Sequence, residues 1–532
     1  MKVLFVRPNR DTFGFKPISI SILSAIAKKQ KWEVKLFDTT NIDLGEFGYD
    51  SRKVADASKL FKPVDFSQYN LKKEKIDLKE KIIQDIIDFN PDLVSISVLS
   101  DQYLISDKIT KSIKEKFPQL PIIWGGAYAT LNPEKVLDIH KADFVCVGEG
   151  IEAFSEVLQK LEKNDSLDKI QNIWTKKNGV IIKNKVRPLK ENLDDLPYLD
   201  WSIYDKNQFL KPFDGKVLIG GDHMITWGCP NHCTYCINHF YYTLYDKKYP
   251  IRGYSVKRII EELKFLKNKY QIEFYKFNDE NFLLRPLDNF RELSEMYSRE
   301  VNLPFAMMCN AKSATPEKVE LLKKMNCVSI SFGLECGDFE LRKTLLNRID
   351  SKDDIIKCVA MFNRAGIRTS SFNMLALPFY SRDTYMKTVE LNKEANIQYP
   401  NAVFFYPYEG TKLREISIKE GFFDPNDINT SEYRDERPSL HFKNLTEQEL
   451  IEMHKVFVLY IKLPKDYEPF IKRSEILDET GIKLREKLNE IYDATVMKND
   501  GWYNDEDNRS QYLNTLEKNL RNGLDNPKLV KK

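Results

Sequence analysis

The chain has 532 residues, 42% of them hydrophobic and 30% charged, which is enough length for two to four domains with ordinary cores. Its 82 basic and 79 acidic residues leave a net charge of +3, which argues against a general nucleic-acid-binding protein. No apolar run approaches the ~20 residues that span a bilayer, and the apolar start, Met1–Pro8, is too short for a signal-peptide core.

The first 165 residues alternate apolar strands with helices. Apolar strands separated by helices are typical of a parallel sheet covered on both faces, which binds ligands at the carboxyl ends of its strands. We therefore predict a doubly wound, Rossmann-like domain over residues 1–165. Its expected strands are Val3–Val6, Val34–Phe37, Leu93–Leu99, Pro121–Trp124 and Asp143–Val147, and its expected helices are Ile18–Lys29, Ser106–Phe117 and Glu152–Leu161.

Residues 166–212 are predicted to form a hairpin and a linker. Two apolar runs, Ile170–Trp174 and Val180–Lys183, flank Asn178-Gly179, a dipeptide typical of a two-residue hairpin turn. Acidic and proline-containing segments follow, with Asp200-Trp201 just before the next domain.

From residue 213 to residue 420, strand and helix alternate six times. This pattern predicts an open partial (β/α)6 barrel of the TIM type, with its chemistry at the carboxyl ends of the strands. The expected strands after the first are Phe274–Phe277, Phe305–Met308, Val328–Phe332, Ser370–Leu375 and Ala402–Phe405. The expected helices are one with apolar positions from Val256 to Leu266 and four near Asn289–Arg299, Pro316–Lys324, Asp353–Arg364 and Ser381–Ala395.

Residues 421–532 are predicted to be mostly helical with a charged tail. Thr446-Glu447-Gln448-Glu449 is a capping box that precedes an amphipathic run from Leu450 to Leu459. The last ~35 residues are charged and rich in asparagine, so we expect them to be mobile.

Three cysteines, Cys229, Cys233 and Cys236, form a C-x3-C-x2-C pattern just past the apolar run Met224–Trp227. Three thiolates without a fourth ligand can hold an iron–sulfur cluster that has one open iron. A structural zinc site with His232 or His239 as fourth ligand is the alternative, although zinc sites more often use two separated ligand pairs. The remaining cysteines, which are scattered singly and favour a reducing, cytoplasmic location, are Cys146, Cys309, Cys327, Cys336 and Cys358.

This cysteine spacing, with the aromatic Tyr235 just before the last cysteine, resembles the signature of radical S-adenosylmethionine (SAM) enzymes. The resemblance implies a [4Fe–4S] cluster whose open iron chelates the methionine end of SAM. It also implies that reduction cleaves SAM to a 5′-deoxyadenosyl radical, and that Tyr235 packs near the adenine. Reduction requires an external low-potential electron donor of the flavodoxin or ferredoxin type.

Further motifs of the same family follow the second and fourth barrel strands. Asp279 and Glu280 are expected to hold the amino group of SAM, although both would also suit a helix N-terminus. Gly333 and Glu335 lie in a segment that resembles the family motif Gly-Leu-Glu-Ser-Gly, so Glu335 is expected near the ribose hydroxyls or the amino group. Lys343 stands where the family carries a basic residue that can pair with the cofactor carboxylate.

The strand ends of the first domain resemble those of cobalamin-binding domains. The similar residues are Ser97, Leu99, Gly125, Gly126, Gly148 and Glu149. The family motif Asp-x-His-x-x-Gly, which supplies a histidine to cobalt, is absent, and His140 is the only histidine in this domain. The resemblance therefore implies cobalamin without a histidine ligand, and it leaves a flavin or an empty domain as alternatives.

Together these motifs cover about 400 residues. In this order they resemble one group, the radical SAM enzymes that carry a cobalamin-binding domain. They imply a cobalamin-dependent methyltransferase that methylates an unactivated carbon of a small-molecule substrate. A radical rearrangement, ring closure or ring contraction without methyl transfer is the alternative within enzymes. A non-enzymatic cluster or cobalamin sensor is the third reading.

Overall fold

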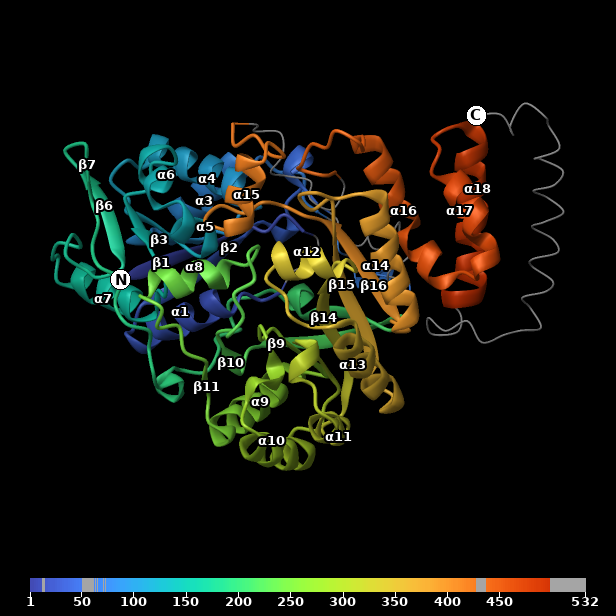
Figure 1. The fold of residues 1–532 in the computed structure, drawn as a ribbon. Coiled ribbons are helices and arrows are strands. Elements are labelled where there is room, and N and C mark those ends of the chain that lie inside the picture. The colour runs from blue at the N-terminus through green and yellow to red at the C-terminus, as the bar shows by residue number, and fades with distance from the viewer. Residues whose placement is uncertain are drawn as a thin grey trace.

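The computed structural model describes residues 1–11, 15–49, 73–426 and 437–497, with residues 62, 64, 66–69 and 71 between them. Two seven-stranded sheets form the body of the molecule, and a group of helices follows them at the C-terminal side (Figure 1). The predicted fold class, a Rossmann-like domain followed by a partial barrel, is confirmed.

The first sheet has the strand order β2-β1-β3-β4-β5-β6-β7, and β2 to β5 run parallel. Its central strands β1, β3 and β4 are mostly apolar and buried because helices cover both faces. The strands are β1 (Lys2–Arg7), β2 (Glu33–Asp38), β3 (Leu93–Ser97), β4 (Ile122–Gly125), β5 (Phe144–Cys146), β6 (Ile173–Lys177) and β7 (Val180–Ile182). The helices are α1 (Ile18–Lys29), α3 (Leu78–Phe89), α4 (Tyr103–Lys116), α5 (Ala127–Leu131), α6 (Pro133–Asp138) and α7 (Ile151–Glu162).

The predicted hairpin is present between β6 and β7. Asn178 and Gly179 have φ angles of 49° and 80°, the left-handed conformation that a tight two-residue turn requires. The hairpin is not part of a free connector, because β6 pairs antiparallel with β5 and so extends the first sheet.

The second sheet has the order β16-β15-β14-β13-β12-β9-β8, with six parallel strands and an antiparallel β8 at one edge. It is the predicted half-barrel, closed on its outer face by helices. The strands are β8 (Leu210–Phe213), β9 (Lys216–His223), β12 (Phe274–Phe277), β13 (Phe305–Cys309), β14 (Cys327–Glu335), β15 (Arg368–Leu375) and β16 (Tyr399–Phe404). The helices are α8 (Ile237–Leu244), α9 (Val256–Tyr270), α10 (Leu287–Glu300), α11 (Pro316–Lys324), α12 (Phe339–Thr344), α13 (Lys352–Arg364), α14 (Arg382–Glu394) and α15 (Lys412–Lys419).

Side chains alternate between the two faces of the barrel sheet. Tyr275 and Phe277 of β12 belong to the hydrophobic core under the helices, together with Ile330 and Phe332 of β14. Because successive side chains of a strand point to opposite faces, the residues between them, such as Lys276, lie on the inner face. The inner face and the carboxyl ends of the strands are therefore where a ligand can bind.

Three helices complete the described chain, namely α16 (Glu447–Lys462), α17 (Glu468–Ser474) and α18 (Glu479–Tyr492). The predicted capping box is confirmed, because the Thr446 hydroxyl accepts from the Glu449 backbone and the Glu449 carboxylate accepts from the Thr446 backbone. Helix α16 packs against α14 and β16 with an apolar face. The charged tail predicted to be mobile falls largely on residues 498–532, which lie outside the described residues.

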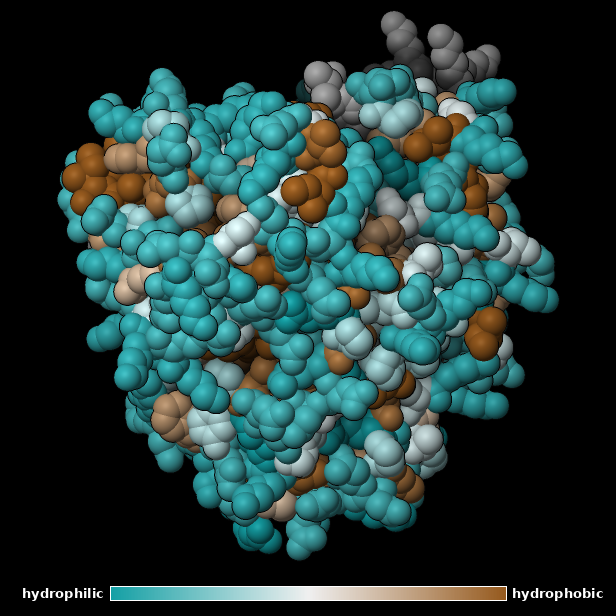
Figure 2. All heavy atoms as spheres, turned by 90° about the vertical axis from the view of Figure 1, so that its left-hand side faces the viewer, coloured by the Kyte–Doolittle hydropathy of each residue, from teal (hydrophilic) through white to brown (hydrophobic). Residues whose placement is uncertain are grey.

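The surface seen from one side is mainly hydrophilic, with hydrophobic side chains in small separate groups (Figure 2). Within the described ranges, no helix combines the length and the apolar character that crossing a membrane requires.

Candidate active site

Cys229, Cys233 and Cys236 lie on one loop at the mouth of the barrel, between the two-residue strand β10 (Thr226–Trp227) and helix α8. The loop is turned by a hydrogen bond from the Cys236 backbone to the Cys233 carbonyl, and Cys236 is the N-cap of α8. Burial raises the pKa of Cys229, and raises that of Cys236 to about 12, while neighbouring cysteine thiolates raise both further. Bound iron would offset this cost, so three thiols on one loop, Cys233 buried and Cys229 and Cys236 half-buried, fit a metal cluster.

The zinc alternative requires four side chains around one ion. Across the described residues, no three His, Cys, Asp or Glu side chains gather closely enough to hold a single metal ion. His232 instead packs on Tyr242, with ring centres 4.4 Å apart, and on His239 at 5.9 Å. A cluster binds each thiolate through a different iron, so the three cysteines fit it better than they fit zinc.

Two of the predicted SAM motifs meet beside the cysteines, although they are a hundred residues apart in the chain. The Tyr235 hydroxyl donates a hydrogen bond of 2.9 Å to Oε1 of Glu335. Glu335 has a left-handed backbone with φ of 67°, so its side chain folds back over Gly333. A Cβ atom at Gly333 would lie 2.0 Å from Oε1 of Glu335, which explains why glycine stands there.

The basic side chain in this network is Arg348, which the sequence motifs did not indicate. Its Nη2 donates to the Gly333 carbonyl at 2.6 Å and its Nη1 lies 3.4 Å from the Tyr235 hydroxyl. Lys343, expected in this role, is exposed on α12 instead. Its neighbour Arg342 is fully buried and pairs with Asp350 at 3.2 Å. The one feature of the sequence that could have indicated Arg348 is its position six residues after Arg342, in the same segment.

Asp279 and Glu280 occupy different positions at the end of β12. Asp279 is fully buried, and its carboxylate accepts from the backbone of Thr226 at 2.6 Å and of Ile225 at 3.2 Å. Burial raises its pKa to about 7, and these two N–H donors oppose the rise. Asp279 therefore positions the segment that leads into the cysteine loop.

Glu280 is exposed at the barrel mouth and lies close enough to raise the pKa of Cys229 and Cys236. The residue that caps the following short helix, Phe282–Leu284, is neither Asp279 nor Glu280 but Asn281, whose side chain accepts from the Leu283 backbone. Of the two predicted carboxylates, Glu280 is the one that faces the cysteines, and its contact with SAM stays a prediction.

Five of the six residues expected at a cobalamin site line one cavity of about 240 Å³ at the strand ends of the first sheet. They are Ser97, Gly125, Gly126, Gly148 and Glu149. Leu99 does not line it and is 50% exposed. Trp227 and Tyr241, which flank the cysteine loop, complete the wall. The cavity thus lies between the strand ends of the first sheet and residues that flank the cysteine loop.

Gly126 and Gly148 are required by close approaches. Gly126 has φ of 93° and ψ of −172°, and a Cβ there would lie 2.8 Å from the Val98 carbonyl oxygen. A Cβ at Gly148 would lie 2.5 Å from the Tyr245 hydroxyl, which accepts from the Glu149 backbone at 2.7 Å. Both glycines therefore allow the cavity wall to form.

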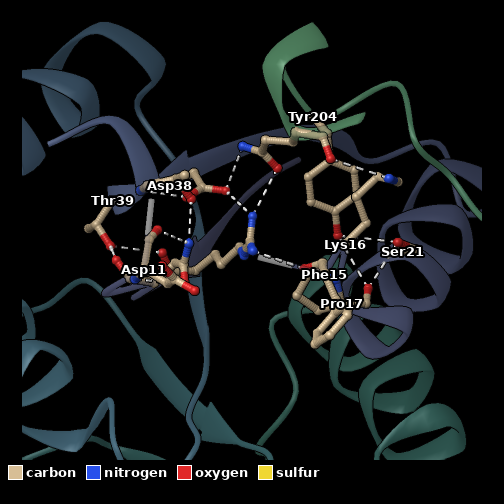
Figure 3. Close-up of polar contacts among 12 residues, drawn as sticks. Asp11, Phe15, Lys16, Pro17, Ser21, Asp38, Thr39 and Tyr204 are labelled. Atoms are coloured by element: carbon tan, nitrogen blue, oxygen red, sulfur yellow. Dashed lines mark hydrogen bonds and ion pairs between the residues drawn. The ribbon is translucent and has the colours of Figure 1, made fainter. Parts of the chain in front are cut away.

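Described residues on both sides of the turn after β1 make fixed contacts. Arg7 donates to Asp38 and to the Phe15 carbonyl at 2.9 Å each (Figure 3), and Lys16 pairs with Asp222 of β9 at 3.1 Å. The contacts of His140 agree with the prediction that cobalamin binds without a histidine ligand to cobalt. Its two ring nitrogens contact the Tyr128 hydroxyl at 3.0 Å and the Asp107 carboxylate at 2.8 Å, so neither is free for cobalt.

Ion pairs join the first domain to the barrel around both sites. Arg252 pairs with Glu149 at 2.8 Å, and Lys135 pairs with Glu409 at 2.5 Å. The Glu149 carboxylate also accepts from the Lys190 backbone at 2.9 Å. Glu149 therefore links the first domain to the barrel through its ion pair with Arg252, and it also lines the cavity.

Two family models match the chain at these two sites. The model of the radical SAM superfamily matches residues 224–391, and that of the B12 binding domain matches residues 12–158. An uncharacterized methyltransferase of Pyrococcus horikoshii is 25% identical over 383 residues, which are 71% of this chain and 80% of the relative. The cytidylyl-2-hydroxyethylphosphonate methyltransferase of Streptomyces wedmorensis is 23% identical over 470 residues, 80% of this chain and 83% of the relative.

A solved structure shares the fold from end to end. The radical SAM methyltransferase TsrM from Kitasatospora setae, with cobalamin and a [4Fe–4S] cluster bound, superposes with a TM-score of 0.63 at 14% identity. The superposition covers 92% of this chain and 99% of TsrM. With the two models matched in order, the chain combines a B12-binding domain with a radical SAM domain, and its cofactors are a [4Fe–4S] cluster, SAM and cobalamin.

Proposed function

We propose that this enzyme methylates an unactivated carbon of a small-molecule substrate. When bound, the reduced cluster with SAM supplies a hydrogen-abstracting radical, and cobalamin supplies a methyl group. The observation that carries the proposal is the shared cavity, whose wall combines the glycines of the first domain with Trp227 and Tyr241 beside the cluster cysteines. A methyl carrier at Gly126 would therefore lie next to the radical source.

The residues of the chain hold the cofactors and the cysteine loop in place, and the cofactors make and break the bonds. We assign Glu280 to the amino group of SAM, and the Tyr235–Glu335 pair to the adenosine part. Asp279 keeps the cysteine loop in register through three hydrogen bonds to the Ile225 and Thr226 backbone. The buried Trp201 and Tyr204 at the domain junction help to exclude water from the space between the domains.

The two curated methyltransferase relatives support this reaction over a rearrangement. Both stages of the proposed reaction consume SAM, and reduction of the cluster requires an external low-potential donor, for which we propose a flavodoxin or a ferredoxin. The donor would reach the cluster at the barrel mouth, where Glu280 and His232 border the cysteine loop.

Anaerobic turnover with SAM carrying a trideuterated methyl group tests the proposal. We expect 5′-deoxyadenosine and S-adenosylhomocysteine to form together, and the product to gain a labelled methyl group by mass spectrometry. Formation of 5′-deoxyadenosine without S-adenosylhomocysteine, with a product that gains no methyl group, would refute methylation and favour a radical rearrangement or ring closure.

A further inference from the structure

The inner face of the barrel carries an excess of positive charge on neighbouring strands. Lys276 of β12 lies directly opposite Asp222 of β9 in the strand register. Lys211 of β8 and Lys16 of the loop after β1 reach the same place, each with its ammonium about 3 Å from Asp222, at 3.0 Å and 3.1 Å. One carboxylate therefore faces three ammonium groups.

One oxygen of Asp222 is engaged by two of these lysines, and the other, Oδ1, has no hydrogen-bond partner among the described residues. The same oxygen, Oδ2, receives Lys16 and Lys211 and also the Lys16 backbone N–H at 3.1 Å. Lys16 and Asp222 are both fully buried. In the part of the chain that the structure describes, the Lys276 ammonium makes no ion pair and no hydrogen bond.

The only contact of the Lys276 ammonium in the described chain is with an aromatic ring. It lies 4.0 Å from the centre of the Phe15 ring, and Lys211 lies 5.2 Å from the same ring. A cation–π contact of this kind stabilises a charge by less than its desolvation costs. Burial and the charge of Lys211 accordingly lower the pKa of Lys276 to about 8.

The interior of the barrel is open to solvent at β15, in the same sheet. Phe372 lies in the middle of β15, an interior strand, and is still 36% exposed. It is paired with Gly333 in the register and faces away from the helices, because its neighbours Ser371 and Asn373 bond to Asn392 of α14. An inner-face side chain of an interior strand can reach solvent only if the barrel interior is not filled.

We propose that Lys276 binds an oxyanion of the substrate, a carboxylate or a phosphate or phosphonate group, inside the barrel. A bound anion completes the charge balance that three ammonium groups and one carboxylate leave open. This inference rests on the proposed function for its substrate, and it narrows that substrate to an anionic class.

The position also limits the shape of the substrate. Lys276 precedes Glu280 by four residues on the same strand and loop, which is at most about 13 Å of extended backbone. The cysteines lie beside Glu280 at the mouth. A substrate that reaches from Lys276 to Glu280 therefore needs to span at most about 13 Å, with the Phe15 ring beside the Lys276 ammonium.

Equilibrium dialysis of the holoenzyme, with SAM bound, tests the site with two probes, radiolabelled inorganic phosphate and radiolabelled acetate. We expect saturable binding of one anion per chain to at least one probe, weakened by about tenfold or more in Lys276→Met and largely kept in Lys276→Arg. Lys257→Met, on the outer helix α9 with an 80% exposed side chain, is the matched control and should bind as the wild type does.

Binding of phosphate rather than acetate would identify a phosphorus oxyanion, and the reverse a carboxylate. Absence of saturable binding of both probes, or equal binding by wild type and Lys276→Met with normal cluster and cobalamin content, would overturn the inference. Reductive SAM cleavage is measured separately on the wild type and Lys257→Met. Its absence would refute the proposed function without touching the anion measurement.

Discussion

Gly126 gives the sharpest test of the cobalamin cavity. Its backbone, with φ of 93° and ψ of −172°, is in a region that only glycine adopts readily, which costs another residue about 1–3 kcal/mol. The added Cβ would also lie 2.8 Å and 3.0 Å from the backbone oxygen and nitrogen of Val98, atoms that cannot move without shifting the end of β3. Such overlap costs about 1–3 kcal/mol. Gly126→Ala should therefore lower the free energy of unfolding by about 2–6 kcal/mol.

Gly179→Ala is the matched control, because Gly179 has φ of 80° and no atom within 4 Å of its added Cβ. It should lose only the conformational part, about 1–2 kcal/mol. Urea denaturation of both apoproteins measures the difference, and titration with cobalamin measures binding, which should be lost in Gly126→Ala and kept in Gly179→Ala. If Gly126→Ala is no less stable than Gly179→Ala, the close approach of Gly126 to Val98 is wrong.

Three further predictions concern the cluster, the cofactor network and pH. Alanine at Cys229, Cys233 or Cys236 should remove about one cluster's iron and its visible absorbance while cobalamin still binds; iron retained in the triple variant would place the cluster elsewhere. Tyr235→Phe removes the bond to Glu335 and should weaken SAM binding by about 2–10-fold in equilibrium dialysis, whereas Tyr198→Phe should not; equal effects would contradict the assigned role. Burial lowers the pKa of Lys462 to about 7 from its ordinary 10.5, so the unfolded chain holds more protons between these pH values. The unfolding free energy of the wild type minus that of Lys462→Met should therefore rise from pH 7 to pH 9, by at most about 1.4 kcal/mol per pH unit. Urea denaturation at each pH measures this difference. A difference that stays constant with pH would contradict the burial of the Lys462 ammonium.

Element positions could be read from the sequence because they depend on local patterns. Strand β12 and helix α11 lie at the predicted residues, and the hairpin turn at Asn178-Gly179 is where its dipeptide indicated. The sheet to which the hairpin belongs could not be read, because the pairing of β6 with β5 joins segments that no periodicity connects.

Some site residues could be predicted from sequence motifs, and others could not. The cysteines and the Tyr235–Glu335 pair carried motifs, and the structure brings them together. Arg348 and Lys276 carried none, because their roles depend on which strands are neighbours and on which face a side chain lies. The two carboxylates of the Asp279-Glu280 pair look equivalent in sequence, and only the register of β12 buries one and leaves the other at the mouth.

Helix α8 explains why both cofactor sites occur in one fixed arrangement. Cys236 caps its first turn, and Tyr245 follows its last residue and contacts Gly148 and Glu149 of the first domain. Tyr245 lies nine positions after Cys236, about 13 Å at the rise of an α-helix. A helix of this length is stiff, so the cysteine loop cannot move relative to the cobalamin cavity without breaking the Tyr245 contact or the Arg252–Glu149 ion pair. The distance between the cysteine loop and the cavity at Gly148 is therefore set by one short helix rather than by the long linker that joins the domains in the chain.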